Sequence, residues 1–335
     1  MKQIHHTQQN KIIYKKEWKY PFLSINLTRF IGITLKNLNI KNKEPKMQGV
    51  IIEIGSNLYK AINKENGETY NLIPRGKLKK EETTPVVGDN VEFNEQGTIE
   101  KILPRKVYIK RPKLANITQM ILVVSSKDPK PDLLLLDKQI AFAEYLKIKV
   151  VIVLNKIDLD KKKQMEKIKE TYEKIGYKVI ETQAKEKKGI EELKQALSKN
   201  INAFSGNSGV GKSTLINGIF KEELTKEGEI SQKNKRGKNT TTTIKLYEIE
   251  KDTYIADTPG FATFEISEIE SKELEKYFIE FKPYIQNCEF IGCTHIKEEK
   301  CGIKKAIEEG KISQERYERF CKIYEQLKEK EKRKW

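Results

Sequence analysis

The segment GNSGVGKST, residues 206–214, constrains the fold more than any other part of this sequence. It matches the pattern Gly-x4-Gly-Lys-Ser, it follows the apolar run INAFS, and it opens a stretch with helical periodicity from Lys212 to Phe220. A glycine loop between a strand and a helix turns its backbone amides toward phosphate oxygens, and the helix N-terminus adds positive potential. We therefore predict a phosphate-binding loop made of Gly206, Asn207, Ser208, Gly209, Val210, Gly211, Lys212, Ser213 and Thr214.

Such a loop does not select a base, and an upstream tetrad is the candidate for that task. The apolar run KVVIVLN ends in Asn155 and is followed by Lys156, Ile157 and Asp158. The Asp158 carboxylate can accept hydrogen bonds from N1–H and from the exocyclic amine of guanine, whereas adenine would leave it unpaired. Asn155 is expected to reach the other edge of the base, and the Lys156 stem to cover the ring. The alternative is that Asn and Asp cap a helix.

The order of the two motifs is unusual. In most GTPases the phosphate loop precedes the Asn-Lys-x-Asp tetrad, but here it comes after it. KNTTTT at 238–243 and DTPG at 257–260 then follow the loop. Ligand contacts depend on where loops lie in space, so joining the old termini and opening the chain elsewhere preserves a site. We therefore predict a circularly permuted GTPase, and the tetrad argues against the alternative of a phosphate-loop ATPase acting on DNA.

The two downstream segments supply the remaining candidates for catalysis beside Lys212, which should bridge the β- and γ-phosphates, and Ser213, which should ligate Mg²⁺. Asp257 is placed on the metal side of the nucleotide and Gly260 at the γ-phosphate. We place Thr241 in the catalytic set, although the sequence does not decide which of the four threonines binds Mg²⁺. Those threonines can also simply begin a β-strand.

The pattern of apolar residues divides the chain into three folded parts and an extension. Five short strands between residues 47 and 113, separated by turn residues, suit an OB-fold barrel that binds RNA. Alternating strands and helices over 114–267 imply a mostly parallel sheet with helices on both faces. Residues 268–335 are helical and highly charged. The predicted class is therefore α/β, with an N-terminal barrel, a permuted GTPase domain and a C-terminal helical module.

Three of the four cysteines lie close together with a histidine. CEFIGCTHIKEEKC supplies Cys288, Cys293, His295 and Cys301, while Cys321 lies in a later helical run. Three thiolates and one imidazole form a closed tetrahedral Zn²⁺ set, which favours a structural site over a catalytic one. The alternative is a chance grouping of free thiols. Four cysteines are too few for a secreted disulfide scaffold, so a reducing compartment is expected.

The charge of the chain points to a polyanionic partner. The formal net charge is +17 over 335 residues, and no run approaches the ~18 apolar residues that a membrane span needs. Residues 1–46 hold ten lysines or arginines against two glutamates. We predict that this extension is disordered; an RNA-binding arm, a transit peptide, or a start codon placed too far upstream of Met47 are the alternatives. Nothing in the pattern indicates an obligate dimer, so a monomer is expected.

The combined motifs resemble the RsgA family, the bacterial small-ribosomal-subunit biogenesis GTPases. The resemblance covers roughly Met47 to Leu327 and includes LPRKVYIKRPKLANITQ and ERYERF. It implies a cytoplasmic GTP hydrolase in late maturation of the 30S subunit, with GTP and GDP as ligands, 16S rRNA contacts from the barrel and the zinc module, and stimulation by the subunit. The alternative is a GTP-binding RNA assembly factor with little hydrolysis of its own.

Two positions depart from the family pattern. The first switch of the family usually reads Gly-Arg-Gly-Arg-His-Thr-Thr-Thr, and its histidine is proposed to assist hydrolysis, but Asn239 stands there in this chain. TQAK at 182–185 could place backbone amides near the guanine oxygen, but Gln183 stands where the family has a serine, which weakens that assignment. Unlike Ras-like enzymes, which have a glutamine able to position water after this motif, the chain has Phe261 after DTPG. We therefore expect slow intrinsic turnover, with Asn239 or a ribosomal group completing the site.

Overall fold

The computed structural model of the chain describes residues 46–56, 58–75, 84–220, 244–257, 266 and 268–333. The predicted extension therefore lies outside the described residues, apart from Lys46. Lys46 pairs with Glu92 at 3.6 Å and with Glu100 at 3.0 Å. Within these ranges, every helix is too short or too polar to pass through a lipid bilayer.

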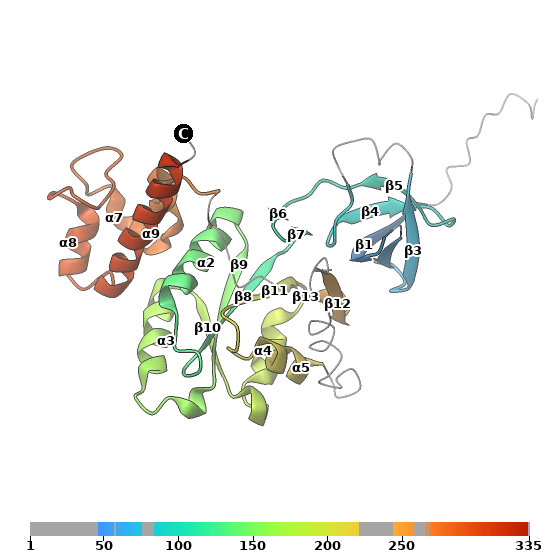
Figure 1. Cartoon of the computed structure of the whole chain (residues 1–335), viewed down its shortest axis with the longest axis horizontal. Helices are drawn as coiled ribbons and strands as arrows, with labels where there is room; N and C mark the ends of the chain where they lie inside the picture. The colour runs from blue at the N-terminus through green and yellow to red at the C-terminus, as the bar shows by residue number, and fades with distance from the viewer. Residues whose placement is uncertain are drawn as a thin grey trace, which may run out of the picture. The chain divides into compact units, whose positions relative to one another are not determined.

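A five-stranded barrel forms the first folded part (Figure 1). Its strands pair in the order β1-β2-β3-β5-β4, and β4 pairs again with β1, which closes the ring. This closed order is that of an OB-like barrel and confirms the predicted fold. The strands are β1 (Met47–Ile54), β2 (Tyr59–Asn63), β3 (Thr69–Pro74), β4 (Asn90–Phe93) and β5 (Thr98–Ile102). The side chains that fill its interior are Ile51, Ala61, Leu72, Val91, Phe93 and Ile99.

A second set of strands builds the sheet that carries the predicted nucleotide loops (Figure 1). Its order is β10-β9-β8-β11-β13-β12, and all neighbours are parallel except β12 and β13. The predicted mostly parallel sheet is therefore confirmed. The strands are β8 (Gln119–Ser125), β9 (Lys149–Asn155), β10 (Lys178–Thr182), β11 (Ile201–Ser205), β12 (Lys245–Glu250) and β13 (Thr253–Asp257).

Helices cover both faces of this sheet because successive strand residues point in opposite directions. Met120 and Leu122 belong to the apolar cluster that includes helices α2 and α3, whereas Ile121 and Val123 belong to the cluster with α4 and α5. Strands buried on both faces read as continuous apolar runs, as QMILVVS and KVVIVLN do. The helices are α2 (Leu133–Leu146), α3 (Gln164–Ile175), α4 (Ile190–Leu197) and α5 (Lys212–Ile219).

The barrel and the parallel sheet are joined through one antiparallel contact between β1 and β12. Glu53 lies opposite Lys245 in this pairing, and their side chains form an ion pair of 3.1 Å. Lys60 pairs with the same carboxylate at 3.2 Å. This pairing joins the barrel and the parallel sheet into one eleven-stranded sheet, although the sequence pattern predicts them as separate parts.

The C-terminal part is helical and packs around an aromatic core. Phe281 and Phe320 lie 4.9 Å apart between ring centroids, and Phe278 lies 5.1 Å from Phe320. The Ser313 side chain caps the long final helix by accepting a hydrogen bond from the Arg316 amide. The elements are the 3-10 helices η4 (Ser271–Tyr277) and η5 (Ile279–Phe281), followed by α7 (Lys282–Ile285), α8 (Gly302–Glu308) and α9 (Gln314–Lys332).

A buried ionic cluster connects this helical part to the parallel sheet. Asp137 of α2 accepts hydrogen bonds from Arg316 and Arg319 of α9 and from the Tyr172 hydroxyl of α3. Arg316 also donates to Glu280. Burial alone would lower the pKa of Arg316, but the two carboxylates raise it well above its ordinary value. The cluster contains two acids and two arginines, so it is buried without net charge.

Candidate functional site

The three glycines of the phosphate loop have backbone conformations that favour glycine, and two of them are also closely packed. Gly206, Gly209 and Gly211 have φ angles of 141°, 81° and 101°. A Cβ on Gly206 would lie 2.3 Å from the Val123 carbonyl oxygen, and one on Gly211 would lie 2.3 Å from Asn155 Nδ2. Both distances are shorter than the contacts that Cβ atoms make in real proteins. A side chain at position 206 would therefore displace the loop from β8, and one at position 211 would displace the Asn155 side chain.

Lys212 begins α5 and turns its amine back into the loop. Its Nζ donates to the carbonyl oxygens of Gly206 at 2.7 Å and Asn207 at 2.9 Å. Burial lowers the pKa of Lys212 from its ordinary value. An ammonium group that is partly desolvated and surrounded by carbonyl oxygens gains from an anionic partner, and phosphate oxygens would supply one. Ser213 and Thr214 follow it in the first helical turn and are exposed.

Asn155 joins the tetrad 155–158, which is predicted to read guanine, to the phosphate loop. It ends β9, its side chain is 1% exposed, and its Nδ2 donates to the Val210 carbonyl oxygen at 2.9 Å. Its Oδ1 accepts from the Thr182 hydroxyl at 3.0 Å and from the Ala184 amide at 3.2 Å. The three loops that follow β9, β10 and β11 therefore meet at one amide, at the carboxyl edge of the sheet where α/β proteins bind ligands.

Lys156 and Asp158 lie on the solvent side of this junction. Lys156 adopts a left-handed backbone conformation with φ 60°, and its Nζ donates to Gly209 O at 2.8 Å. Its amine also donates to the Asp128 carbonyl oxygen. The next two residues belong to the 3-10 helix η1 (Ile157–Leu159), in which Ile157 is half-buried and Asp158 exposed. The Asp158 carboxylate is thus open to a base placed beside the phosphate loop.

Of the remaining predicted catalytic residues, the structure describes only Asp257. Asp257 is the last residue of β13, which pairs in parallel with β11 through Ala203 and Ala256. Its backbone therefore ends at the same sheet edge as the phosphate loop. Asn239, Thr241 and Gly260 lie outside the described residues.

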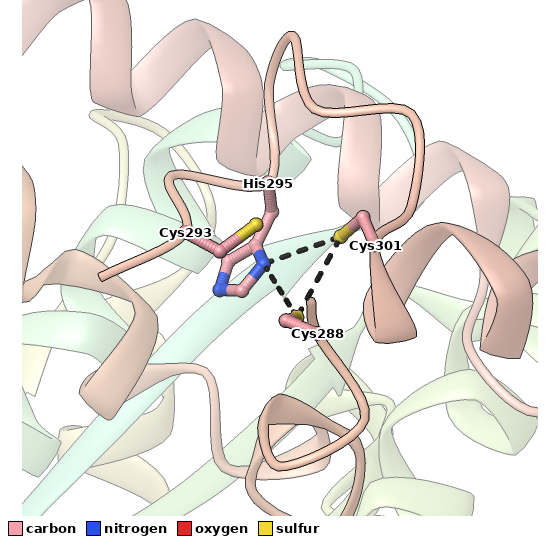
Figure 2. A group of neighbouring side chains, drawn as sticks. All are labelled: Cys288, Cys293, His295 and Cys301. Atoms are coloured by element: carbon pink, nitrogen blue, oxygen red, sulfur yellow. Dashed lines mark hydrogen bonds between the residues drawn. The ribbon is translucent and has the colours of Figure 1, made fainter. Parts of the chain in front are cut away.

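The four predicted metal ligands lie together, as Figure 2 shows. Their ligand atoms are all within 4.8 Å of one another, and His295 Nδ1 lies 3.3 Å from Cys301 Sγ and 3.6 Å from Cys288 Sγ. Sulfur atoms around a tetrahedral Zn²⁺ are separated by about 3.8 Å, since each Zn–S bond is about 2.3 Å. The 4.0 Å between Cys288 Sγ and Cys301 Sγ fits that geometry. The predicted set can therefore hold a metal ion.

Groups around this cluster fix its ligands. His295 Nε2 contacts the Glu275 carboxylate, which leaves Nδ1 free to face the thiols. The Gly302 amide donates to Cys288 Sγ at 3.3 Å. Burial, followed by the neighbouring thiols, raises the pKa of Cys293 to about 12. The Cys293 thiol is thus a poor anion by itself, and a divalent cation would be needed to hold it as a thiolate.

Glu298 stabilises the loop between the last two ligands. It accepts hydrogen bonds from the Thr294 hydroxyl and from the amides of Thr294, Ile296 and Lys297. Burial would raise the pKa of Glu298, but these donors lower it to about 2. The carboxylate therefore stays ionised at any ordinary pH and fixes the loop.

Sequence reasoning missed several supporting residues of both sites. Asp132 caps α2 and also accepts a hydrogen bond of 3.2 Å from Asn207 Nδ2 of the phosphate loop. Gln139 donates to the Ser205 hydroxyl just before the loop at 2.8 Å. No feature of the sequence distinguishes Glu275 from the other acidic residues around it. Asp132 before an apolar helical run is a recognisable cap, but no local signal indicates its second partner.

Comparisons with known proteins agree with this geometry. A family model described as RsgA N-terminal domain matches residues 48–100, and one described as RsgA GTPase matches residues 102–267. The small ribosomal subunit biogenesis GTPase RsgA of Ruminiclostridium cellulolyticum is 39% identical over 287 residues, covering 84% of this chain and 94% of that protein. The RsgA of Thermotoga maritima is 38% identical over 288 residues, covering 84% and 97%.

Two solved structures share the fold over most of the chain. YjeQ from Thermotoga maritima has a TM-score of 0.74 at 36% identity, covering 84% of this chain and 99% of that one. YloQ, described as a circularly permuted GTPase, has a TM-score of 0.73 at 28% identity, covering 87% and 98%. The order of motifs in this chain therefore agrees with the description of this fold as a circularly permuted GTPase. Sequence, motif order and structure together show that this chain belongs to the RsgA family of circularly permuted GTPases.

Proposed function

We propose that this chain binds GTP with Mg²⁺ at the junction of its three sheet-edge loops and hydrolyses it during late maturation of the small ribosomal subunit. Asp158 reads guanine, Asn155 and Lys156 hold the tetrad against the phosphate loop, and Lys212 and Ser213 bind phosphate and Mg²⁺. Support comes from the contact between Asn155 and Val210, which brings the base-reading loop and the phosphate loop within reach of one nucleotide. Asp257, Gly260, Asn239 and Thr241 complete the proposed catalytic set.

The proposed roles of the three folded parts are those that membership of the RsgA family implies. The barrel over 47–113 and the helical module over 268–335 contact 16S rRNA, while residues 114–267 form the GTPase domain. The relatives are named for small-subunit biogenesis, and the net charge of +17 suits an RNA partner. A cytoplasmic monomer that binds the 30S subunit is the corresponding proposal.

Hydrolysis is expected to be slow until the subunit binds. Asn239 cannot act as a general base, since an amide does not accept a proton at neutral pH. Its amide would orient the attacking water only weakly, and a ribosomal group would assist it. Single-turnover hydrolysis of GTP should therefore rise at least tenfold when purified small subunits are added, at a fixed salt concentration. A Lys212→Ala variant should lose hydrolysis in both conditions.

Two results would overturn this proposal. Fast hydrolysis by the isolated chain would show that no ribosomal group is needed. Hydrolysis that stays negligible with subunits present, together with GTP-dependent binding to them, would favour the alternative of an assembly factor that uses GTP only as a conformational ligand.

We propose further that the Cys288, Cys293, His295 and Cys301 set binds one structural Zn²⁺. All four positions are taken by protein ligands, which is the composition of structural rather than catalytic zinc sites. When bound, the ion would supply the positive charge that keeps the three thiols ionised. Glu275 would orient His295 toward it.

Metal analysis tests this second proposal. The purified chain should carry one zinc per molecule, and Cys301→Ser should carry far less, with a lower unfolding temperature. Cys321→Ser provides the matched control, because Cys321 is a half-buried cysteine of α9 outside the cluster and should keep full zinc content. Full zinc occupancy in Cys301→Ser would contradict the assignment.

A further inference from the structure

Side chains from two directions hold the phosphate loop. The tetrad binds its second half, where Lys156 donates to the Gly209 carbonyl oxygen at 2.8 Å and Asn155 donates to the Val210 carbonyl oxygen at 2.9 Å. Helix α2 binds the strand end and the first half of the loop, residues 205–208. This helix neither reads the base nor supplies a proposed catalytic residue, so its contacts call for another explanation.

The first of the α2 contacts is buried. Gln139 Nε2 donates to the Ser205 hydroxyl at 2.8 Å, and the two residues are 2% and 1% exposed. Ser205 is the last residue of β11 and directly precedes Gly206. A buried amide costs free energy unless it is hydrogen-bonded, and an apolar side chain would serve packing alone without that cost. The Gln139 amide therefore fixes the point at which the strand turns into the loop.

The second contact lies at the start of α2. Asp132 Oδ1 accepts a hydrogen bond from the Leu135 amide at 3.0 Å and caps the helix, while its Oδ2 accepts one from Asn207 Nδ2 at 3.2 Å. The Asn207 carbonyl oxygen in turn accepts a hydrogen bond from Lys212 Nζ at 2.9 Å. One carboxylate thus connects the cap of α2 to the loop residue that the phosphate-binding lysine contacts.

The space between α2 and the loop is nearly filled. A cavity of about 10 Å³ lies between them, which is room for about one water molecule, and it is lined by Asp132 and Gln139 of the helix and by Gly206 and Asn207 of the loop. On the side of β8, a Cβ on Gly206 would already lie 2.3 Å from the Val123 carbonyl oxygen. The first half of the loop therefore has little freedom to move toward either neighbour.

We propose that Gln139 and Asp132 are positioning residues for the phosphate loop, acting through Ser205 and Asn207. The inference rests on the proposed function, since it takes the loop to be the site of the nucleotide phosphates. Loop amides bind phosphate best when they already point at it, and every population of other loop conformations lowers the affinity. The two α2 contacts restrict those conformations. They strengthen binding at the β-phosphate and leave recognition of the base unaffected.

Removing the buried contact from either end tests this role in the full-length chain. Gln139→Leu and Ser205→Ala should each weaken GDP binding by up to about tenfold, because other loop conformations then compete by the strength of one hydrogen bond. The double variant should lose about the same tenfold rather than a hundredfold, since both changes remove one contact. Asn207→Ala keeps the cap of α2 and should cost about threefold, because its partner is exposed. Titration with fluorescent GDP measures each affinity.

A shorter nucleotide and a matched glutamine separate positioning from general damage. GMP lacks the β-phosphate, so its affinity, measured by competition with fluorescent GDP, should change by less than about twofold in Gln139→Leu. Gln119 is 3% exposed and donates to Asn202 Oδ1 and to the Ala196 carbonyl oxygen, each at 2.8 Å. It begins β8, at the end of the strand opposite to the loops. Gln119→Leu should lower the unfolding temperature but keep the affinity for GDP.

Three results would overturn the proposal. One is a GDP affinity that stays within about twofold of the unsubstituted chain in both Gln139→Leu and Ser205→Ala. The others are an equal loss of affinity for GMP, or an equal loss in Gln119→Leu, since either would show a general effect on the domain. If the unsubstituted chain bound no guanine nucleotide, the proposed function itself would fail, and the positioning role with it.

Discussion

Replacing Asp158 by asparagine is expected to weaken GTP binding by roughly 10²–10⁴-fold. The carboxylate would accept two hydrogen bonds from guanine, each contributing about 1.5–3 kcal/mol, and an asparagine amide would turn a donor toward guanine donors. Xanthine carries an oxygen where guanine carries its amine, so the same variant should gain affinity for xanthosine triphosphate. Equilibrium titration with fluorescent GDP, GTP and xanthosine nucleotides measures both changes.

A neighbouring aspartate supplies the control for this experiment. The Asp160 carboxylate accepts hydrogen bonds from the amides of Gln164 and Met165 at 3.1 and 2.7 Å, so it caps α3. Asp160→Asn should cost about 1 kcal/mol or less in stability and leave the choice of base unchanged. Retention of GTP affinity by Asp158→Asn, or an equal loss in both variants, would show that Asp158 does not read the base.

Arg316→Met is expected to lower the free energy of unfolding by about 3–5 kcal/mol. Arg316 is 1% exposed, and its guanidinium contacts both Asp137 and Glu280. Methionine fills much of the same volume but leaves these carboxylates with one cation between them, and an uncompensated buried charge is far more costly than a lost surface pair. Urea unfolding of the metal-loaded chain, followed by fluorescence, measures the change.

Arg333→Met on the same helix is the matched control. Arg333 is exposed at the C-terminal end of α9, so its replacement should change stability by less than about 0.5 kcal/mol. The double variant Asp137→Leu, Arg316→Met should be less destabilised than the sum of its single changes, because it removes opposite charges together. Equal, small effects of Arg316→Met and Arg333→Met would show that the buried cluster does not hold α9 against α2.

Local chemistry explains why so much was predictable. Helix α2 coincides with the amphipathic run LLLLDKQIAFAEYL, and β9 coincides with the apolar run KVVIVLN, because apolar runs between a cap and a turn leave few alternatives. The phosphate loop and the cysteine–histidine cluster were also predictable. The glycines of 206–211 and the four predicted metal ligands each lie within a short stretch of sequence. Strands β6 (Tyr108–Lys110) and β7 (Lys113–Ala115) were not predicted, because three-residue strands carry almost no periodic signal.

The sequence by itself determined the longer elements, the order of motifs and the candidate residues for nucleotide and metal binding, since each depends on neighbours a few positions away. Tertiary structure decided which distant groups meet. Asn155 and Val210 are 55 residues apart, and Asp137 and Arg316 are 179 apart. The sequence does not show whether a charged residue of a helix faces water or a buried partner. Only the folded structure excludes water from such a pair, and this exclusion sets the strength of the interaction.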